Sequence, residues 1–229
     1  MAHKILIVDD EPVIREILEF NLASEGYEIT CATSAEDAMS KLTIDHSLIL
    51  LDIMMGGMSG YKMAEQLRRN NNNIPIIFLT AKDTENDMLT GFSVGGDDYI
   101  SKPFSVKEVI ARVKAVLKRN KITEVSDNQD NKIISDKITI DLKLKEVIID
   151  EEKIILTKTE FEILALLAKD SEKVFSRDEI IDILWKDTPF ITERTVDVHI
   201  TRLRKKLGNY SKIISNRSGF GYRFNTNAL

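Results

Sequence analysis

The sequence has little that could cross-link it, bind a soft metal or anchor it in a membrane. It contains one cysteine, Cys31, which excludes an internal disulfide. Its three histidines, His3, His46 and His199, show no metal-ligand spacing. No stretch approaches the roughly 18 consecutive apolar residues of a spanning helix, and the strand-like run Met1–Asp9 lacks the anatomy of a signal peptide. We therefore expect a cytoplasmic protein without a membrane partner.

Basic residues gather in one stretch near the carboxyl end. The whole chain has a formal net charge of −5 at pH 7. Between Arg194 and Arg223 there are eight basic residues and one acid, Asp197, so this stretch carries +7 and all other residues together carry −12. A basic patch on an otherwise acidic chain is typical of a polyanion site, because the patch releases phosphate counterions while the acidic surface elsewhere discourages indiscriminate binding.

The 229 residues are enough for two domains, and the first 120 alternate short apolar strands with amphipathic helices. Strands are predicted at Lys4–Val8, Glu28–Ala32, Leu48–Asp52, Pro75–Thr80 and Asp98–Ser101. Helices are predicted from Pro12 to about Gly26, after the N-cap Ser34, around Tyr61–Leu67, over Glu85–Val94 and over Val106–Lys118. The first helix is expected to turn inward Val13, Ile14, Ile17, Leu18 and Leu22. The alternation predicts an α/β domain over 1–120 with a five-stranded, doubly wound parallel sheet.

Polar side chains follow the strands of this sheet where the strands end. Asp9 and Asp10 follow the first strand, and the later strands end near Asp52, Thr80 and Lys102. Ligands of open α/β sheets bind beyond the carboxyl ends of the strands, so we expect these side chains in one crevice. Carboxylates 4 Å apart repel by roughly 4 kcal/mol per pair at an effective dielectric near 20. The cluster therefore favours a cation with oxygen ligands, Mg²⁺ above all.

The same crevice is suited to phosphoryl transfer. With the metal on one side and Lys102 on the other, it would hold a phosphoryl group in line with Asp52, which attacks as a carboxylate nucleophile. Thr80 would supply a hydroxyl to a phosphoryl oxygen.

Two other functions of this fold class fit less well. A flavin or dinucleotide site needs a glycine-rich or Ser/Thr-rich phosphate loop after the first strand, where this chain has Asp9, Asp10 and Glu11. A phosphatase with an aspartyl nucleophile would place a second acid two residues after Asp52, and that residue is Met54.

These positions and the run DDYISKPF, Asp97–Phe104, resemble the receiver domain of bacterial response regulators. The resemblance covers about residues 1–120 and implies a flavodoxin-like fold. It implies that a sensor histidine kinase donates a phosphoryl group to Asp52, with Lys102 in the catalytic site. It also implies that Thr80 and Tyr99 form the switch.

The resemblance further implies a set of Mg²⁺ ligands: Asp10, Asp52, the carbonyl of Met54 and, through water, Asp9. Two positions depart from the usual pattern of these domains. Gly56 stands where a proline is usual, and Gly96 stands where an alanine is usual. We expect both glycines to loosen the backbone.

A polar stretch with little periodicity, Arg119–Asp136, follows the first domain. We expect a linker over 121–132 and a second domain over 133–229. The alternating stretch Ile138–Leu156 predicts an antiparallel hairpin or small sheet. Two capping boxes then predict the starts of two helices: Thr157 with Glu160, and Ser176 with Glu179.

The third helix of this domain, Glu193–Leu207, is predicted to have one buried and one basic face. The buried stripe has helical spacing: Val196, Ile200, Leu203 and Leu207. The other face is expected to carry Arg194, Val198, Thr201, Arg202 and Lys205. Such a helix can lie in the major groove of DNA. With a hairpin predicted over Asn216–Phe224, the three helices make an α+β winged helix-turn-helix domain.

Three runs in this half resemble the DNA-binding domain of the OmpR/PhoB family: LTKTEFEILALLA, ERTVDVHITRLRKKLG and GFGYRF. The wing arginine that is usual in the family falls on Ser218, while Arg217 lies one place earlier. Successive strand residues face opposite sides. Arg217 is nevertheless a candidate DNA contact.

The sequence thus predicts a phosphorylation-controlled, sequence-specific transcription regulator rather than an enzyme. Its expected partners are a sensor histidine kinase, double-stranded DNA, RNA polymerase and, on activation, a second copy of the chain. The alternative is a regulator that binds DNA without phosphorylation and uses its receiver as a protein-interaction and dimerisation module.

The family resemblance also implies a dimer face on the fourth helix, fifth strand and fifth helix, which here carries Met88, Asp97, Asp98, Glu108 and Arg112. A basic residue on the fourth helix usually pairs with the acid that is Glu108 in this chain. That position reads Met88. We therefore expect a weaker and less salt-sensitive dimer than in relatives with the full charge set.

Overall fold

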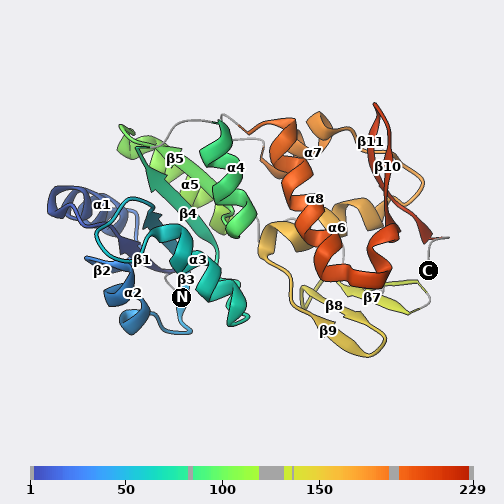
Figure 1. Cartoon of the computed structure of the whole chain (residues 1–229), viewed down its shortest axis with the longest axis horizontal. Helices are drawn as coiled ribbons and strands as arrows, with labels where there is room; N and C mark the ends of the chain where they lie inside the picture. The colour runs from blue at the N-terminus through green and yellow to red at the C-terminus, as the bar shows by residue number, and fades with distance from the viewer. Residues whose placement is uncertain (1–2, 82–84, 119–131, 136, 186–190, 227–229) are drawn as a thin grey trace. The chain divides into compact units, whose positions relative to one another are not determined.

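The computed structural model describes residues 3–81, 85–118, 132–135, 137–185 and 191–226; the side chains of residues 85, 86, 88, 118 and 135 lie outside the description as well. The chain divides into two compact units, Met1–Lys118 and Arg119–Leu229, and each is described by itself (Figure 1).

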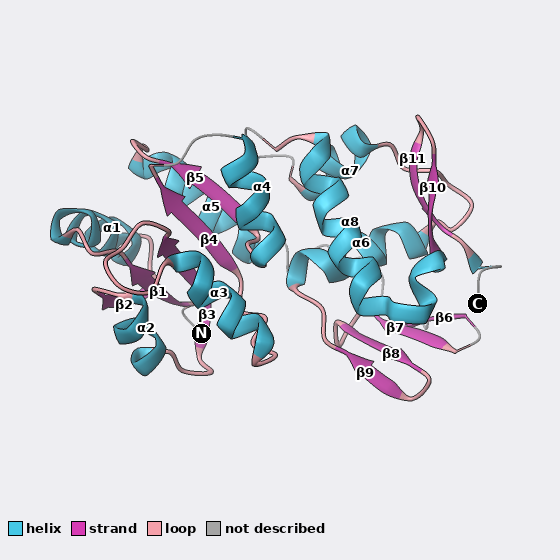
Figure 2. Cartoon of the chain, in the orientation of Figure 1, coloured by secondary structure: helices cyan, strands magenta, loops and turns pink. Residues whose placement is uncertain are grey.

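The first unit is the predicted doubly wound sheet, with all strands parallel in the order β2-β1-β3-β4-β5. The strands are β1 (Lys4–Val8), β2 (Glu28–Ala32), β3 (His46–Asp52), β4 (Ile76–Thr80) and β5 (Asp98–Ser101). The helices between and after them are α1 (Pro12–Ser24), α2 (Ala35–Lys41), α3 (Gly60–Arg69), α4 (Glu85–Val94) and α5 (Val106–Lys118). The predicted fold class is therefore confirmed, and the strand order reverses between β1 and β3, where Asp9 follows β1 and Asp52 ends β3 (Figure 2).

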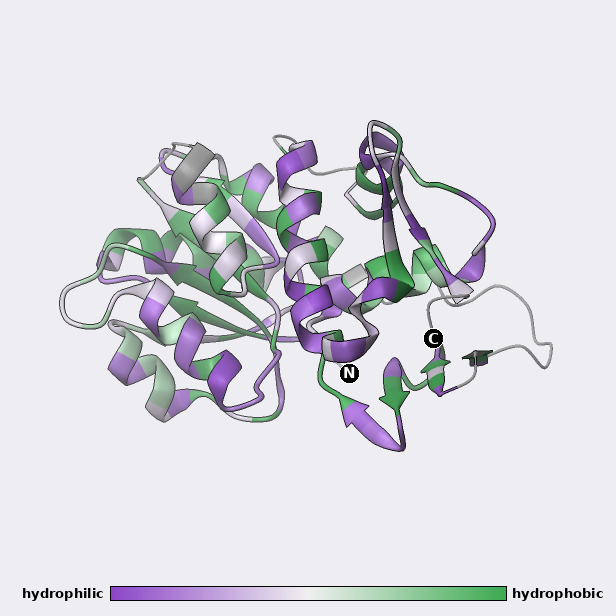
Figure 3. Cartoon of the chain, turned by 45° about the vertical axis from the view of Figure 1, so that its right-hand side comes forward, coloured by the Kyte–Doolittle hydropathy of each residue, from purple (hydrophilic) through white to green (hydrophobic). Residues whose placement is uncertain are grey.

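The central strands β1, β3 and β4 are buried on both faces, which explains their continuous apolar sequences, whereas most residues of the edge strand β2 are partly exposed. In β1, Ile5 and Ile7 pack with α1 and α5, while Leu6 and Val8 point to the opposite face and are also fully buried. Figure 3 shows these central strands as predominantly apolar.

The prediction for the inward face of α1 needs correction. Leu18 and Leu22 are buried as expected, but Val13 is 62 % exposed and Ile17 is 42 % exposed. With Phe20, which is 73 % exposed, they form an outward apolar stripe at i, i+4 and i+7. The helix therefore has two apolar stripes, and periodicity alone does not tell which one packs on the sheet.

The second unit combines an antiparallel sheet, three helices and a wing. The sheet has the order β6-β7-β8-β9, with β6 (Lys132–Ser135), β7 (Ile138–Asp141), β8 (Glu146–Ile149) and β9 (Glu152–Ile154). The helices are α6 (Lys158–Lys169), α7 (Arg177–Leu184) and α8 (Glu193–Leu207), followed by the 3-10 helix η2 (Gly208–Ile213). The wing is the hairpin of β10 (Ile214–Arg217) and β11 (Gly221–Phe224). The predicted stripe of α8 is confirmed, because its four apolar residues are buried in the core.

The strand β6 corrects the predicted linker. The strand β6 lies inside the stretch Arg119–Asp136 and pairs with β7. It begins at Lys132, the last residue of the predicted linker. Residues 119–131 lie outside the described part of the chain. The strand β6 has only four residues, two of them apolar, and it pairs on one side only. So short a stretch does not show the two-residue period of a strand.

The predicted capping boxes are confirmed. The side chains of Thr157 and Ser176 accept hydrogen bonds from the backbone N–H groups of Glu160 and Glu179, and both glutamates return the bond. These contacts satisfy N–H groups that a helix leaves without an internal partner, so each helix begins where the short local motif places it.

Candidate functional site

An acidic pocket lies where β1 and β3 end. Asp9 and Asp52 are buried and Asp10 is exposed, and one carboxylate oxygen of each lies within 4.8 Å of the others. The two strands are hydrogen-bonded neighbours in register through Val8 and Leu51, so the parallel sheet itself brings the acids together. This arrangement confirms the expected crevice for its acidic members.

Lys102 closes the pocket from the end of β5. Its Nζ lies 2.8 Å from Oδ2 of Asp52, 2.9 Å from Oδ2 of Asp9 and 3.1 Å from Oε1 of the exposed Glu11. Burial opposes the charge of Lys102, but the hydrogen bonds to Asp52 and Asp9 hold the pKa of its amine above the usual range. Burial raises the pKa of Asp9, and the hydrogen bond from Lys102 opposes that rise.

The carboxylate of Asp52 is held at both oxygens. Its Oδ1 accepts a hydrogen bond of 3.0 Å from the N–H of Met54, and its Oδ2 accepts the bond from Lys102. The chain then turns back so closely that a Cβ at Gly60 would lie 2.2 Å from the carbonyl oxygen of Asp52, so this approach requires glycine. At Gly56 a Cβ would meet nothing within 4 Å, so packing does not require glycine there.

The three carboxylates of Asp9, Asp10 and Asp52 outnumber the one amine of Lys102, which pairs with Asp9 and Asp52, and the donor set consists of hard oxygens. Such a set fits a hard divalent cation. A cation would also offset the cost of keeping Asp9 ionised in its buried position. The residues present could therefore hold a metal.

The two residues expected to form the switch, Thr80 and Tyr99, are both buried. The side chains of Thr80 and of Tyr61 in α3 both interact with the Tyr99 hydroxyl and affect its pKa. Burial raises the pKa of Tyr99 well above its usual range. Tyr61 was not among the expected site residues, because its sequence position gives no signal beyond the start of a helix.

Three residues of the expected dimer face lie in the interior of the unit. Asp97, Asp98 and Arg112 are buried within the unit. Nη1 of Arg112 lies 2.9 Å from Oδ1 of Asp98, and Nη2 lies 2.9 Å from Oε1 of Glu108. Glu108 keeps a side-chain exposure of 28 %, and the side chain of Met88 lies outside the described residues. The charges expected to pair between two chains are thus paired within one.

Asp97 has a different internal role. Its Oδ2 accepts a hydrogen bond of 3.0 Å from the N–H of Ile76 and lies 3.6 Å from Arg68 of α3. Asp97 therefore connects the start of β4 to α3 and has a structural role inside the unit.

Most of the candidate DNA-binding residues lie on the outer face of α8. Arg194, Thr201 and Lys205 are exposed and Val198 is half-buried, as expected for a face that could lie in a groove. Arg202 lies at the edge of this face, where its side chain is only 15 % exposed and its Nη2 lies 3.0 Å from Oε1 of Glu160 in α6. It flanks the outer face and pairs inside the domain.

A cluster not foreseen from the sequence fixes α8 against α7 and the wing. Oδ1 of Asp197 lies 2.7 Å from Nε of Arg177 and accepts a hydrogen bond of 2.7 Å from the hydroxyl of Tyr222 in β11. The guanidinium groups of Arg177 and Arg204 lie over the Tyr222 ring, at 4.9 and 5.5 Å from its centroid. The signal in the sequence is Asp197, the one acid in the basic stretch.

The wing is anchored at its root and exposed at its tip. Tyr222 exchanges two backbone hydrogen bonds with Phe175, and a Cβ at Gly221 would lie 2.0 Å from the Phe175 carbonyl oxygen. Arg217 pairs with Gly221 across the hairpin and is exposed, and Phe220 at the turn is 74 % exposed. Arg217 is therefore placed where it could reach a ligand of the wing.

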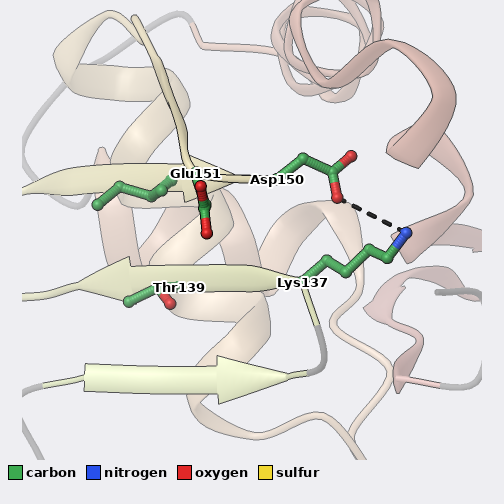
Figure 4. A pocket seen from close by; sticks show the side chains of 5 residues that line it. Lys137, Thr139, Asp150 and Glu151 are labelled. Atoms are coloured by element: carbon green, nitrogen blue, oxygen red, sulfur yellow. Dashed lines mark ion pairs between the residues drawn. The ribbon is translucent and has the colours of Figure 1, made fainter.

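A depression on the antiparallel sheet is lined by Lys137, Thr139, Ile148, Asp150 and Glu151 (Figure 4). Nζ of Lys137 lies 3.7 Å from Oδ1 of Asp150, and the hydroxyl of Tyr210 donates to Oδ2 of Asp150 at 2.6 Å. Because Lys137 and Asp150 pair with each other within the domain, we assign no binding function to the depression.

Across the described ranges, the structure contains no helix that is both long and apolar enough to span a membrane.

Two family models match the chain: the response regulator receiver domain over residues 5–114, and the C-terminal domain of transcriptional regulatory proteins over residues 151–224. Together they cover the acidic pocket, α8 and the wing.

Similar proteins agree with both matches. The chain is 39 % identical to the alkaline phosphatase synthesis transcriptional regulatory protein PhoP of Bacillus subtilis, with 97 % of each chain covered. The OmpR/PhoB homologue DrrB of Thermotoga maritima is 29 % identical, with a TM-score of 0.53 and coverage of 98 % of this chain and 99 % of DrrB. A mutant of RitR is 27 % identical, with a TM-score of 0.76 and the same coverage. The chain therefore belongs to the OmpR/PhoB family of response regulators, phosphorylatable transcription regulators with a receiver domain and a DNA-binding domain.

Proposed function

We propose that Asp52 is the phosphoacceptor of this regulator and that a sensor histidine kinase is the donor. The observation that carries the proposal is the pair of hydrogen bonds that fix the Asp52 carboxylate, from Lys102 and from the N–H of Met54, beside two further acids. A carboxylate oxygen attacks the phosphorus of the phosphohistidine, the P–N bond breaks, and the electron pair leaves with the imidazole. The product is an acyl phosphate.

We assign Mg²⁺ to the acidic pocket, with Asp10, Asp52 and the Met54 carbonyl as ligands and Asp9 acting through water. When bound, the ion neutralises negative charge on the transferring group. Lys102 supplies the second positive charge, since its amine stays protonated between Asp9 and Asp52. Thr80 ends the neighbouring strand and offers its hydroxyl to a phosphoryl oxygen.

The exposed stripe of α1 supports a protein as the donor. The stripe consists of Val13, Ile17 and Phe20. It begins a few residues after Asp9 and Asp10 of the acidic pocket, because α1 starts at Pro12. An apolar stripe of this kind is suited to pack against an apolar partner helix. The stripe would therefore let a kinase helix present its phosphohistidine to Asp52.

The output in this proposal is a population shift. Phosphorylation at Asp52 favours a receiver state that pairs two chains, and pairing two chains raises the avidity for two DNA half-sites. Arg194, Val198, Thr201 and Lys205 on α8 face the major groove, Arg217 lies on the wing, and Arg202 acts from the flank. The regulator then acts on RNA polymerase at promoters in the cytoplasm.

One observation favours the second candidate function, DNA binding without phosphorylation. Tyr99 is already buried and interacts with Thr80 in the unphosphorylated chain. If this is the binding-competent arrangement of the switch, the phosphoryl group adds little to DNA affinity.

The test is phosphoryl uptake from a small phosphodonor with Mg²⁺, followed by mass spectrometry of the intact chain and by DNA binding. We expect the mass of one phosphoryl group on the wild type and none on Asp52→Ala. Asp45→Ala serves as the control, since Asp45 is an exposed acid near the other end of the same strand. A mass shift that survives Asp52→Ala contradicts the assignment, and equal DNA affinity with and without the phosphoryl group favours the second function.

A further inference from the structure

The hydroxyl of Tyr222 joins the wing to α8, the candidate recognition helix. It donates a hydrogen bond of 2.7 Å to Oδ1 of Asp197 in α8 and accepts one of 3.2 Å from Nη2 of Arg177 in α7. Nε of Arg177 donates to the same carboxylate oxygen at 2.7 Å. The three side chains therefore form a closed set of hydrogen bonds between β11, α8 and α7.

A second side chain of α8 holds the other strand of the wing. Nε and Nη2 of Arg204 donate hydrogen bonds of 3.2 and 2.7 Å to the carbonyl oxygen of Ile214, the first residue of β10. The guanidinium group of Arg204 also lies 5.5 Å from the centroid of the Tyr222 ring. The helix α8 thus contacts both wing strands through side chains of its own.

Asp197 is the one acid in a stretch that is otherwise rich in basic residues. A carboxylate close to DNA weakens the attraction to phosphate. In this structure Arg177 offsets its charge, because the guanidinium group lies 2.7 Å from Oδ1. The side chain is 42 % exposed, so Asp197 adds little to the core. Its two hydrogen bonds therefore point to a role in the geometry of α8 and the wing.

We propose that Asp197 is a positioning residue that fixes the wing relative to the DNA-binding face of α8. The inference rests on the proposed contacts of α8 and Arg217 with DNA. Arg217 pairs across the hairpin with Gly221, which precedes Tyr222 in β11. Holding the Tyr222 hydroxyl at α8 therefore also holds Arg217 at a set distance from α8. A wing that is already in place loses little freedom when DNA binds, so the contacts of both elements contribute to affinity.

The substitution Tyr222→Phe isolates the hydroxyl, because it keeps the ring close to the guanidinium groups of Arg177 and Arg204. It removes the hydrogen bond to Asp197. The two backbone bonds between residue 222 and Phe175 stay, so the hairpin itself is expected to form. What the variant lacks is the link between β11 and α8.

The matched control is Tyr210→Phe. Tyr210 belongs to η2 of the same domain, and its hydroxyl also donates to a carboxylate, that of Asp150, at 2.6 Å. Each substitution removes one hydrogen bond between a tyrosine and an aspartate. Only Tyr222→Phe removes it at the wing.

A double-mutant cycle with Arg217→Ala measures the positioning. The affinity of each full-length chain for a specific DNA site selected in vitro is compared at one salt concentration. We expect Arg217→Ala to weaken binding about tenfold in the wild type and in Tyr210→Phe, as the loss of one base contact does. In Tyr222→Phe it should weaken binding only about twofold, because an untethered wing places Arg217 at the DNA less often. A general loss of stability would lower all affinities and leave the factor for Arg217→Ala unchanged.

Two substitutions at Asp197 test the acceptor directly. Asp197→Asn keeps an oxygen that accepts a hydrogen bond from Tyr222, so the factor for Arg217→Ala should stay near the wild-type value. Asp197→Ala removes the acceptor and should behave as Tyr222→Phe does. The pair separates the hydrogen bond from the negative charge, because both variants lack the charge.

A factor for Arg217→Ala that is the same in Tyr222→Phe and the wild type overturns the proposal. If Arg217→Ala has no effect in the wild type, the proposed DNA contact of Arg217 is contradicted instead. Hydrogen exchange of the β10 and β11 amides then decides whether Asp197 holds the wing. Faster exchange in Tyr222→Phe than in Tyr210→Phe supports the positioning role, and equal exchange overturns it.

Discussion

Arg202 in α8 and Glu160 in α6 form an ion pair of 3.0 Å, and the Glu160 side chain is completely buried. Nζ of Lys206 lies 2.7 Å from the other carboxylate oxygen, and the same oxygen accepts the N–H of Thr157 in the capping box. The pair therefore attaches the candidate recognition helix to the first helix of the domain. This gives Arg202 a structural role beside the one foreseen at the DNA.

The first prediction is that Arg202→Ala lowers the free energy of unfolding of the DNA-binding domain by about 1 to 3 kcal/mol, because it leaves a buried carboxylate with Lys206 as its remaining cation. The measurement is denaturant unfolding of the full-length chain. Specific DNA affinity should fall by about 1 to 3 kcal/mol as well. If stability is unchanged while affinity falls, Arg202 acts at the DNA alone.

The second prediction concerns Lys205 and Lys212, which are exposed. Lys205→Ala and Lys212→Ala should weaken binding to all DNA sequences alike and lower the slope of log affinity against log salt by about 1 each, since each removes one phosphate contact. Stability should stay at the wild-type value. Lys143→Ala is the control, because Lys143 is exposed in the turn between β7 and β8. An unchanged salt slope in Lys205→Ala would mean that this face of α8 does not meet phosphate.

The third prediction concerns Gly96, which we expected to loosen the backbone. In the structure a Cβ there would lie 2.7 Å from one carbon of the Phe78 ring and 2.8 Å from another. Gly96→Ala, which restores the usual residue of the family, should therefore destabilise the receiver by about 1 to 3 kcal/mol through overpacking.

The matched test of that packing is the same substitution in a Phe78→Leu background. A smaller side chain on β4 frees the space, so Gly96→Ala should cost less there than in the wild type. Denaturant midpoints of the four chains give the coupling. Equal costs in both backgrounds would show that Phe78 is not what Gly96 accommodates.

The fourth prediction concerns pH. Burial would raise the pKa of Glu160, but the charges of Arg202 and Lys206 outweigh it and hold the pKa below its usual value of 4.5. A carboxyl group whose pKa is lower in the folded state stabilises the fold above about pH 4.5, and that stability is lost as pH falls through the folded-state pKa. The difference in Tm between the wild type and Glu160→Gln should therefore shrink below pH 4.5. A difference that is constant from pH 6 to pH 3 contradicts the linkage.

The acidic pocket could be predicted because it depends on short sequence patterns at the strand ends. Asp9 and Asp52 directly follow apolar strands, and neighbouring parallel strands must end at one edge of the sheet. Lys102 could be placed for the same reason. The capping boxes were equally accessible, since Thr157 and Glu160 lie three residues apart and define a helix start without any tertiary contact.

The contacts that the sequence did not reveal involve partners distant in the sequence. Arg202 lies on the outer half of a helical wheel, and only tertiary packing shows that Glu160, on another helix, draws it inward. Asp98 and Arg112 looked like surface charges because nothing in their spacing shows that β5 and α5 bury the pair. The same limit applies to α1, where two apolar stripes compete and the sheet selects one.

The last prediction concerns the receiver dimer. Glu108 keeps part of its exposure but already pairs with Arg112, so an incoming basic residue must share it. An exposed ion pair contributes about 0 to 1 kcal/mol, and a twofold dimer has two copies. Met88→Arg should therefore tighten the phosphorylated dimer slightly and make it more sensitive to salt. Sedimentation at low and high salt measures both effects.

The control for this prediction is Met88→Arg combined with Glu108→Gln. If the new arginine acts through Glu108 of the second chain, the double variant should lose the gain in association and the gain in salt sensitivity. A gain that persists without Glu108 would mean that the arginine finds another partner. Unchanged or weaker association in Met88→Arg would mean that this chain does not pair through the face formed by α4, β5 and α5. In that case the added arginine would not contact Glu108 of the second chain.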